Sequence, residues 1–219
     1  MTTSDDATLD DLRRRLAPAI AAAAAFDGWS AESVRTAAQV AGVDPDAALF
    51  AFRDGAMAMI AAWIENIDAR MMASLPAASL AGYPVRERIR RLVLFRLEAV
   101  AGLEESLRRA LAVMAMPRNA PRALKLGWHS ADAMWRLAGD VATDFNHYSK
   151  RAILAGVYAA TLAVFVDDRS EGKQDTRAFL DRRLEGIIRF EKAKGQWLKP
   201  GEQGFSMARF LGRLRYPAR

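Results

Sequence analysis

The sequence predicts an all-α fold, and three observations support this prediction. No segment of the 219 residues shows the sustained alternation of apolar and polar residues that a half-buried strand requires. Apolar residues recur instead at helical spacing, and the apolar fraction of 52% is enough for a sizeable core. Glycine and proline are few and scattered. The length allows either one large domain or a small domain joined to a larger one.

Residues 1–75 are expected to form a small helical head. Its helices are predicted at residues 7–25, 31–41, a short stretch that begins at Pro45, and 55–74. Ser30 caps the second helix and Gly42 ends it. Asp44 caps the third helix, whose first position suits Pro45. This order of elements predicts a helix-turn-helix unit packed on a connecting helix.

Residues 76–195 are expected to form a larger helical body, after a boundary between Leu75 and Pro84. Its helices are predicted at residues 85–116, 120–138, 144–166 and 174–193. The run from Leu92 to Leu97 places large apolar side chains on all sides of its helix, so that helix is buried on every face or lines a cavity. Both a dry core and a pocket for a long apolar molecule satisfy this pattern.

The basic charge of the chain is concentrated at its C-terminal end. Residues 189–219 contain eight Lys or Arg and two Glu, a net charge of +6, which equals the formal net charge of the whole chain. Residues 1–188 are therefore balanced. The basic tail predicts an anionic partner, either nucleic acid or a membrane surface.

Residues 196–219 are predicted to be a flexible linker followed by an amphipathic helix at 205–216. Apolar side chains at positions i, i+3, i+4 and i+7 share one face of that helix, and arginines lie on the other face. Such a helix lies in the headgroup layer of a membrane, although its apolar face can also fold back onto the body. The residues predicted to contact the membrane are Met207, Arg209, Phe210, Leu211, Arg213 and Leu214.

The head is predicted not to bind DNA, so nucleic acid is not expected as a partner. A helix-turn-helix reads bases with Arg, Lys, Asn or Gln at the start of its second helix. The corresponding segment, residues 44–52, begins Asp44-Pro45-Asp46 and contains no basic or amide side chain. Carboxylates at this position would repel the phosphates of DNA.

The sequence contains no recognisable catalytic or metal-binding constellation. Cysteine is absent, which excludes disulfides and thiolate metal sites. The two histidines, His129 and His147, belong to no metal-binding spacing, and no nucleotide-binding glycine motif or G-x-S-x-G occurs. We therefore expect no catalysis, no metal and no cofactor. The acidic N-terminal residues and the short apolar stretches predict neither a secretory signal nor a membrane-spanning helix.

Residues 127–151 form the most informative stretch of the chain. It contains Trp128, Trp135, Gly139-Asp140 and the run Asp144-Phe145-Asn146-His147-Tyr148. An ordinary loop is polar, so these rings indicate at least a well-packed helix junction. The pattern also resembles the Coq-nine-type proteins of ubiquinone biosynthesis, and the match extends over most of residues 9–190. One departure is His147, which stands where that family usually has a second aromatic residue before Tyr148.

The resemblance implies a TetR-like fold, with a helix-turn-helix head, a larger ligand-binding body and a C-terminal amphipathic helix. It also implies a non-catalytic accessory protein that binds isoprenoid quinone precursors and presents them to a demethoxyubiquinone hydroxylase of the di-iron type. The implied lipid-binding residues are Leu94, Leu97, Trp128, Trp135, Leu154, Val157, Tyr158, Thr161 and Phe165. The implied partner-binding residues are Asp132, Met134, Asp144, His147 and Tyr148.

The resemblance carries three further expectations. The C-terminal helix would bind an anionic membrane surface, which implies a cytoplasmic protein peripheral on the inner membrane, or on its matrix side in a eukaryote. TetR-like bodies pair through their last two long helices, so a homodimer is expected through residues 144–166 and 174–193. The predicted apolar stripe consists of Phe179, Leu180, Leu184, Ile187 and Ile188. The alternative function is a TetR-like transcriptional regulator whose body binds a small apolar effector.

Overall fold

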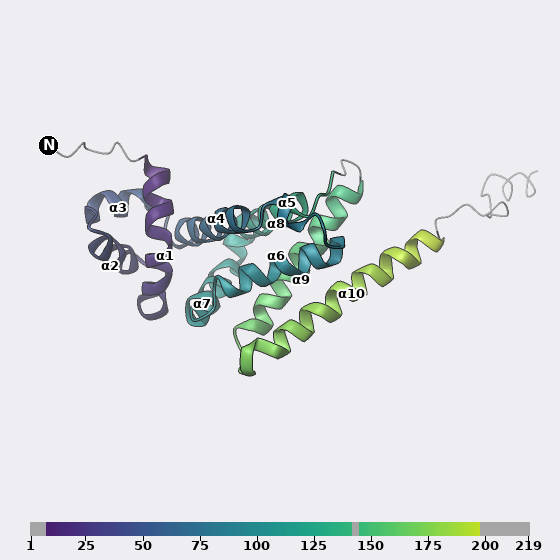
Figure 1. The fold of residues 1–219 in the computed structure, drawn as a ribbon. Helices are drawn as coiled ribbons and strands as arrows, with labels where there is room; N and C mark the ends of the chain where they lie inside the picture. Colours follow the sequence, from purple (N-terminus) through teal and green to yellow (C-terminus); the bar gives the residue numbers. More distant parts are fainter. Residues whose placement is uncertain (1–7, 142–144, 198–219) are drawn as a thin grey trace, which may run out of the picture. The chain divides into compact units, whose positions relative to one another are not determined.

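A computed structural model describes residues 8–141 and 145–197, and the secondary structure in these ranges is helical (Figure 1). No strand occurs in the two described ranges, which confirms the predicted all-α fold. The residues predicted to contact the membrane lie outside the described residues, as does Asp144.

The head and its connecting helix follow the predicted order (Figure 1). They comprise α1 (Leu9–Asp27), α2 (Ala31–Ala41), α3 (Pro45–Ala51) and α4 (Ala56–Ser74). The predicted caps are confirmed, because the Ser30 side chain accepts a hydrogen bond from the Glu32 amide and the Asp44 side chain accepts one from the Asp46 amide. Gly42 ends α2 in the left-handed conformation, with φ of 62°.

The body contains more helices than the sequence predicted. They are α5 (Ala77–Leu80), α6 (Val85–Glu98), α7 (Glu104–Met114), α8 (Ala120–Leu137), α9 (Phe145–Phe165) and α10 (Gln174–Trp197), with short 3₁₀ turns at Pro117–Asn119 and Glu171–Lys173. The single helix predicted over 85–116 is wrong, because the chain breaks between α6 and α7. Gly102 has a φ of +80°, a backbone conformation that residues other than glycine rarely adopt. Helix α7 then begins with Glu104 and Glu105 in its first turn, where negative charge is favourable.

The chain divides into two compact units, Met1–Asp181 and Arg182–Arg219. The predicted boundary between head and body lies within the first unit, where buried contacts join the two parts. The indole nitrogen of Trp29 donates a hydrogen bond to the Ser106 carbonyl oxygen at 3.1 Å, and the Ser106 hydroxyl donates one to the Ala21 carbonyl oxygen at 2.6 Å. These contacts hold α1 and the turn that follows it against α7.

The core of the first unit is built from the inward faces of α1, α4, α6, α8 and α9. Fully or almost fully buried side chains include Leu16, Ile20, Ile60, Met71, Leu92, Met134 and Leu154. Burial of such side chains is the main term that stabilises the fold. Of the described helices, none is by itself long and apolar enough to cross a membrane, whereas α3 and α4 together, which meet at a bend of 89°, have the required length and composition.

Candidate ligand-binding cavity

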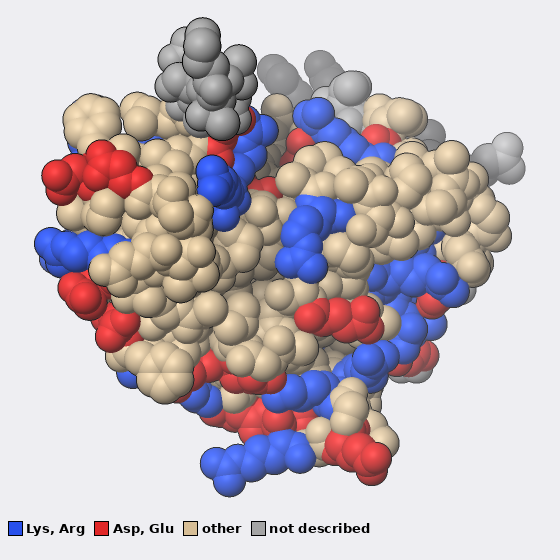
Figure 2. All heavy atoms as spheres, turned by 60° about the vertical axis from the view of Figure 1, so that its left-hand side comes forward, with Lys and Arg blue, Asp and Glu red and all other residues tan. Residues whose placement is uncertain are grey.

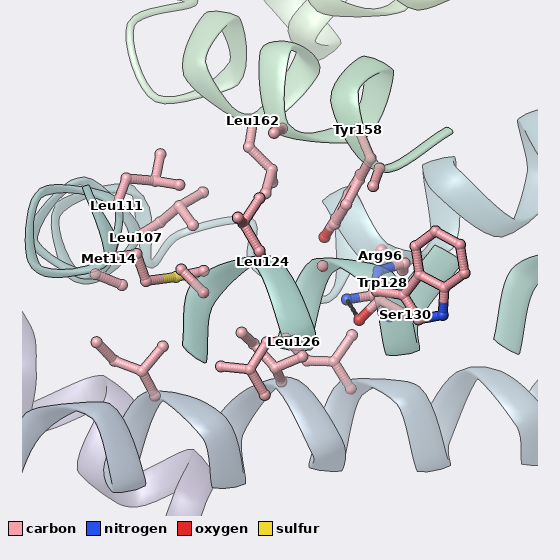
Figure 3. A pocket seen from close by; sticks show the side chains of 18 of the residues that line it. Arg96, Leu107, Leu111, Met114, Leu124, Leu126, Trp128, Ser130, Tyr158 and Leu162 are labelled. Atoms are coloured by element: carbon pink, nitrogen blue, oxygen red, sulfur yellow. Dashed lines mark hydrogen bonds between the residues drawn. The ribbon is translucent and has the colours of Figure 1, made fainter. Parts of the chain in front are cut away.

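A cavity of about 510 Å³ lies in the first unit between α4, the connecting helix of the head, and α7, α8 and α9 of the body (Figure 3). This volume lies within the usual range for small-molecule sites. Most of the lining is apolar. The large apolar side chains that line it are Ile60, Trp63, Ile64, Ile67, Val100, Leu107, Leu111, Met114, Leu124, Leu126, Trp128 and Leu162.

The wall formed by α9 consists mainly of small residues. Ala152, Ala155, Gly156 and Ala159 line the cavity at positions i, i+3, i+4 and i+7 of the helix, so they share one face. A Cβ atom added at Gly156 would meet no heavy atom within 4 Å. The cavity therefore exists because α9 presents its smallest side chains to α4, α7 and α8.

A polar group closes one end of the cavity. Arg96 is 1% exposed, forms an ion pair with Asp68, and donates a hydrogen bond through Nη2 to the Ser130 hydroxyl at 3.1 Å. The Ser130 hydroxyl in turn donates to Asp68 at 3.0 Å. The guanidinium lies 4.8 Å from the centre of the Tyr158 ring. Burial alone would lower the pKa of Arg96, but its neighbours Tyr158 and Asp68 outweigh burial and raise this pKa above its ordinary value.

Two of the predicted lipid-binding residues, Trp128 and Tyr158, line the cavity. The predicted residues that belong instead to the surrounding packing or surface are Leu94, Leu97, Trp135, Leu154, Val157, Thr161 and Phe165. The Thr161 hydroxyl donates a hydrogen bond to the Val157 carbonyl oxygen at 2.7 Å, which satisfies it within α9. Large apolar side chains of α9 were expected to line the cavity, whereas most of the α9 residues that line it are small.

The predicted partner-binding residues fall in different environments. Tyr148 is 60% exposed, and its ring lies 6.0 Å from the Trp128 ring and 5.1 Å from the His147 ring, measured between centroids. We call Trp128, His147 and Tyr148 the aromatic cluster. Met134 must be removed from the predicted surface, because its side chain is fully buried in the core. Asp144 lies outside the described residues.

Asp132, the remaining predicted partner residue, belongs to an ionic cluster that sequence reasoning missed. Arg151 has almost no exposed side-chain surface, and it contacts Asp132 at 2.6 Å and Asp140 at 3.0 Å. Lys150 contacts Asp140 at 2.8 Å. Burial alone would raise the pKa of Asp140, but Lys150 and Arg151 outweigh it and lower this pKa. The cluster joins the end of α8 to the start of α9.

Comparison with known proteins gives the same match from a family model and from individual relatives. Residues 120–191 match the COQ9 family model. The chain is 33% identical over 182 residues to the "Ubiquinone biosynthesis protein COQ9, mitochondrial" of Rattus norvegicus, over 80% of this chain and 58% of that protein. The chain is similar to COQ9 proteins over most of its own length. The corresponding COQ9 protein of Bos taurus is 30% identical over 200 residues, or 88% of this chain and 62% of the relative. The chain thus spans about 60% of the length of these COQ9 relatives.

The fold of the chain is TetR-like, as predicted. A crystal structure of a TetR transcriptional regulator from Nitrosomonas europaea aligns with a TM-score of 0.63 and 22% sequence identity, covering 80% of this chain and 96% of the regulator. At that identity the likeness shows the fold alone.

The surface of the head shows mixed charge. In Figure 2, which brings the side of α1–α3 forward, acidic and basic side chains are interspersed. Asp44 and Asp46 stand at the start of α3, the element that would read bases in a helix-turn-helix. That the head does not bind DNA remains a prediction. In the described part of the chain, no group of three or more His, Asp or Glu side chains is placed to hold a metal ion.

Proposed function

We propose that the protein is a non-catalytic lipid-binding accessory protein of ubiquinone biosynthesis. The observation that carries this proposal is the apolar cavity, which lies in the part of the chain that is homologous to proteins named for ubiquinone biosynthesis. A cavity lined by large apolar side chains and closed by one polar group suits a molecule with a hydrocarbon tail and a small head. The proposed ligands are isoprenoid quinone precursors.

The tail of such a ligand leaves the cavity past Leu124. This side chain lines the cavity and is also 76% exposed, so it stands at the mouth. Met114 lines the cavity on α7, and its flexible thioether side chain adapts to ligands of different shape. A long isoprenoid chain can therefore be held in part, with the remainder outside.

The aromatic cluster is the proposed docking surface for a demethoxyubiquinone hydroxylase of the di-iron type. Trp128 lines the cavity and also contacts the exposed ring of Tyr148, so the cluster joins the cavity wall to the molecular surface. Exposed aromatic side chains are the residues that most often dominate the binding energy of protein interfaces. A hydroxylase bound there would be adjacent to the ligand that it modifies.

The protein is further proposed to act at a membrane and as a homodimer. The relatives are named mitochondrial, and ubiquinone precursors with long isoprenoid tails reside in lipid. The basic segment after residue 196 supplies the positive charge that an anionic membrane surface attracts. The predicted dimer stripe on α10 includes Leu180, which is fully buried in this single chain.

Lipid extraction from the purified protein tests the central proposal. The full chain is expressed in a ubiquinone-producing bacterium, and its bound lipids are identified by mass spectrometry. We expect isoprenoid quinones or their precursors at close to one molecule per chain. Gly156→Phe places a ring in the cavity and should remove most of this lipid, whereas Ala160→Phe adds the same ring to an exposed position of α9 that does not line the cavity.

Two results would overturn the proposal. One is a wild-type protein that carries no lipid and takes up none from quinone-containing vesicles. The other is equal lipid content in the two phenylalanine variants, which would place the lipid elsewhere. Specific retardation of genomic DNA fragments at low salt would favour the transcriptional regulator instead.

A further inference from the structure

The cavity opens to the surface between α8 and α9. Leu124 of α8 lines the cavity and is 76% exposed, and Ala152, Gly156 and Ala159 of α9 line it and are also exposed. Residues 152–166 contain no charged side chain. The border of the opening is therefore apolar, and contact with another apolar phase would remove the free-energy cost of exposing it to water.

One face of α8 runs along this opening. Pro121, Leu124, Lys125 and Trp128 follow at positions i, i+3, i+4 and i+7, so they share a face of the helix. Pro121 and Lys125 are exposed, and Trp128 is half-buried. Met116 is 40% exposed and adjoins the first turn of α8, because its carbonyl oxygen accepts a hydrogen bond from the first amide of that helix at 3.1 Å.

The basic side chains next to this face have no acidic counterpart. No Asp or Glu occurs between Glu105 and Asp132. Arg118 and Lys125 are exposed, and in the part of the chain that the structure describes neither pairs with a carboxylate. Arg118 donates instead to the Met116 sulfur at 3.7 Å. The side chains that we call the rim are Met116, Arg118, Leu124 and Lys125.

The charge of the rim distinguishes between two surfaces that could cover it. The segment of this chain after residue 197 is itself basic, so it would meet the rim with charge of the same sign. An anionic bilayer attracts Arg118 and Lys125, and its hydrocarbon region accepts Leu124 and Met116. Basic side chains and a tryptophan around exposed apolar residues are typical of a membrane interface. The rim therefore suits a lipid surface.

We propose that the rim docks on an anionic lipid bilayer, so that the cavity opens directly onto the membrane. Two basic groups contribute too little to hold the protein there alone. The C-terminal segment tethers the protein, and the rim orients it. The use of this contact rests on the proposed function, because a lipid then passes between bilayer and cavity without entering water.

A single fluorescent label on the rim tests the contact. The chain contains no cysteine, so Met116→Cys in the full-length protein provides one attachment site for an NBD fluorophore, at a residue that does not line the cavity. On addition of vesicles of phosphatidylcholine and phosphatidylglycerol, we expect the emission to shift to the blue and to be quenched by lipids with spin-labelled acyl chains. The same label at Val40, which is 79% exposed on α2, should stay in water.

Neutralising the rim connects the contact to its charge. Arg118→Gln combined with Lys125→Gln should lower the affinity for these vesicles roughly 30-fold, because each basic group near an anionic surface contributes about 1 kcal/mol. Arg70→Gln combined with Arg169→Gln is the matched control, since it removes the same charge at two exposed positions outside the rim. Circular dichroism establishes that each variant is folded.

Three results would overturn the rim as a membrane contact. The first is a Met116 label that stays in water while the protein is bound to vesicles. The second is equal vesicle affinity for the two double variants. The third is a label that is already in an apolar environment before vesicles are added and leaves it afterwards, which would show that the C-terminal segment covers the rim.

The vesicles contain no quinone, so this test is independent of the ligand. A protein that inserts its rim but carries no isoprenoid lipid would refute the proposed function and leave the membrane contact in place. A protein that carries such a lipid but keeps the Met116 label in water would refute the membrane contact alone.

Discussion

Asp168 is a buried carboxylate that organises the connection between α9 and α10. It accepts hydrogen bonds from the amide and hydroxyl of Ser170 and from the amide and hydroxyl of Thr176, at 2.6–2.8 Å. Burial alone would raise the pKa of Asp168, but these four bonds outweigh burial and hold this pKa well below its ordinary value. One side chain thus sets the start of α10.

Replacing Asp168 should destabilise the protein. In Asp168→Ala the buried amide and hydroxyl of Thr176 lose their acceptor, so we expect the free energy of unfolding to fall by about 2–3 kcal/mol. Urea unfolding at pH 7 measures this change. Asp167→Ala is the control, because Asp167 is mostly exposed and its ion pair with Arg108 lies at the surface. Equal unfolding midpoints for the two variants would contradict the assigned role.

The contribution of the Asp168 carboxylate should depend on pH in a defined direction. Because its folded-state pKa is depressed, the stabilisation is complete above the unfolded-state pKa of about 3.9 and is lost as the pH falls below it. The difference between wild type and Asp168→Asn should therefore be constant from pH 7 to 5 and shrink towards pH 2. Urea midpoints at each pH measure it. A difference that grows at low pH would show that the carboxylate is not the stabilising group.

At the scale of elements, the ionic cluster of Arg151 joins α8 to α9. Asp132 on α8 and Asp140 after it both contact this one guanidinium, which also donates to the His147 carbonyl oxygen at 3.1 Å. The same junction carries the aromatic cluster. The ionic contacts therefore position the proposed docking surface relative to the cavity.

Removing the guanidinium should be costly because it takes the buried partner from two carboxylates and leaves Asp132 with the exposed Arg136 and Asp140 with Lys150. We expect Arg151→Met to lower the free energy of unfolding by about 3–5 kcal/mol. Arg136 also contacts Asp132, at 2.8 Å, but its side chain is 72% exposed. Arg136→Met should therefore cost less than about 1 kcal/mol. Chemical unfolding at pH 7 compares the two variants, and similar losses would argue against a buried cluster.

Substitution of Tyr148 tests the proposed docking surface. Tyr148→Ala removes an exposed ring, so the fold should persist while capture of the demethoxyubiquinone hydroxylase in a pull-down falls by tenfold or more, as for an interface hot spot of about 2 kcal/mol. Tyr83→Ala, at another partly exposed tyrosine before α6, is the control. Undiminished capture by Tyr148→Ala would remove the aromatic cluster from the interface.

At the scale of the whole molecule, the charge distribution predicts that the C-terminal segment binds the membrane surface. Deleting residues 203–219 should abolish sedimentation with liposomes that contain cardiolipin or phosphatidylglycerol, without lowering the helical content of the body. Replacing Arg209 and Arg213 by Gln should weaken binding by about 2 kcal/mol, roughly 30-fold, because each basic group near an anionic surface contributes about 1 kcal/mol. Binding that survives the deletion would place the membrane surface elsewhere.

The predicted homodimer is also a property of the whole molecule. Isologous pairing of the last two long helices would bury the apolar stripe of each chain against the same region of the other chain. Light scattering at micromolar concentration should then give about 48 kDa, twice the 24.1 kDa of one chain. A strict monomer would show that the stripe serves only its own chain, as the burial of Leu180 allows.

The sequence by itself determined the features that depend on neighbouring residues. Helical periodicity placed most of the helices, and short-range capping chemistry placed their ends at Ser30, Gly42 and Asp44, because a cap is decided within three or four residues. The resemblance predicted from residues 127–151 agrees with the similarity to COQ9 proteins. The break at Gly102 was missed, since an isolated glycine in an apolar pattern does not distinguish a bend from a continuous helix.

Only the tertiary structure decided which face of each helix meets the cavity. Helix α9 is apolar around most of its circumference, so periodicity cannot tell the side of Leu154 from the side of Gly156. The partner of Arg96 is Asp68, 28 residues away, and no local pattern indicates such a pairing. A cavity is space left between several helices, and that space depends on their packing rather than on any one segment of the chain.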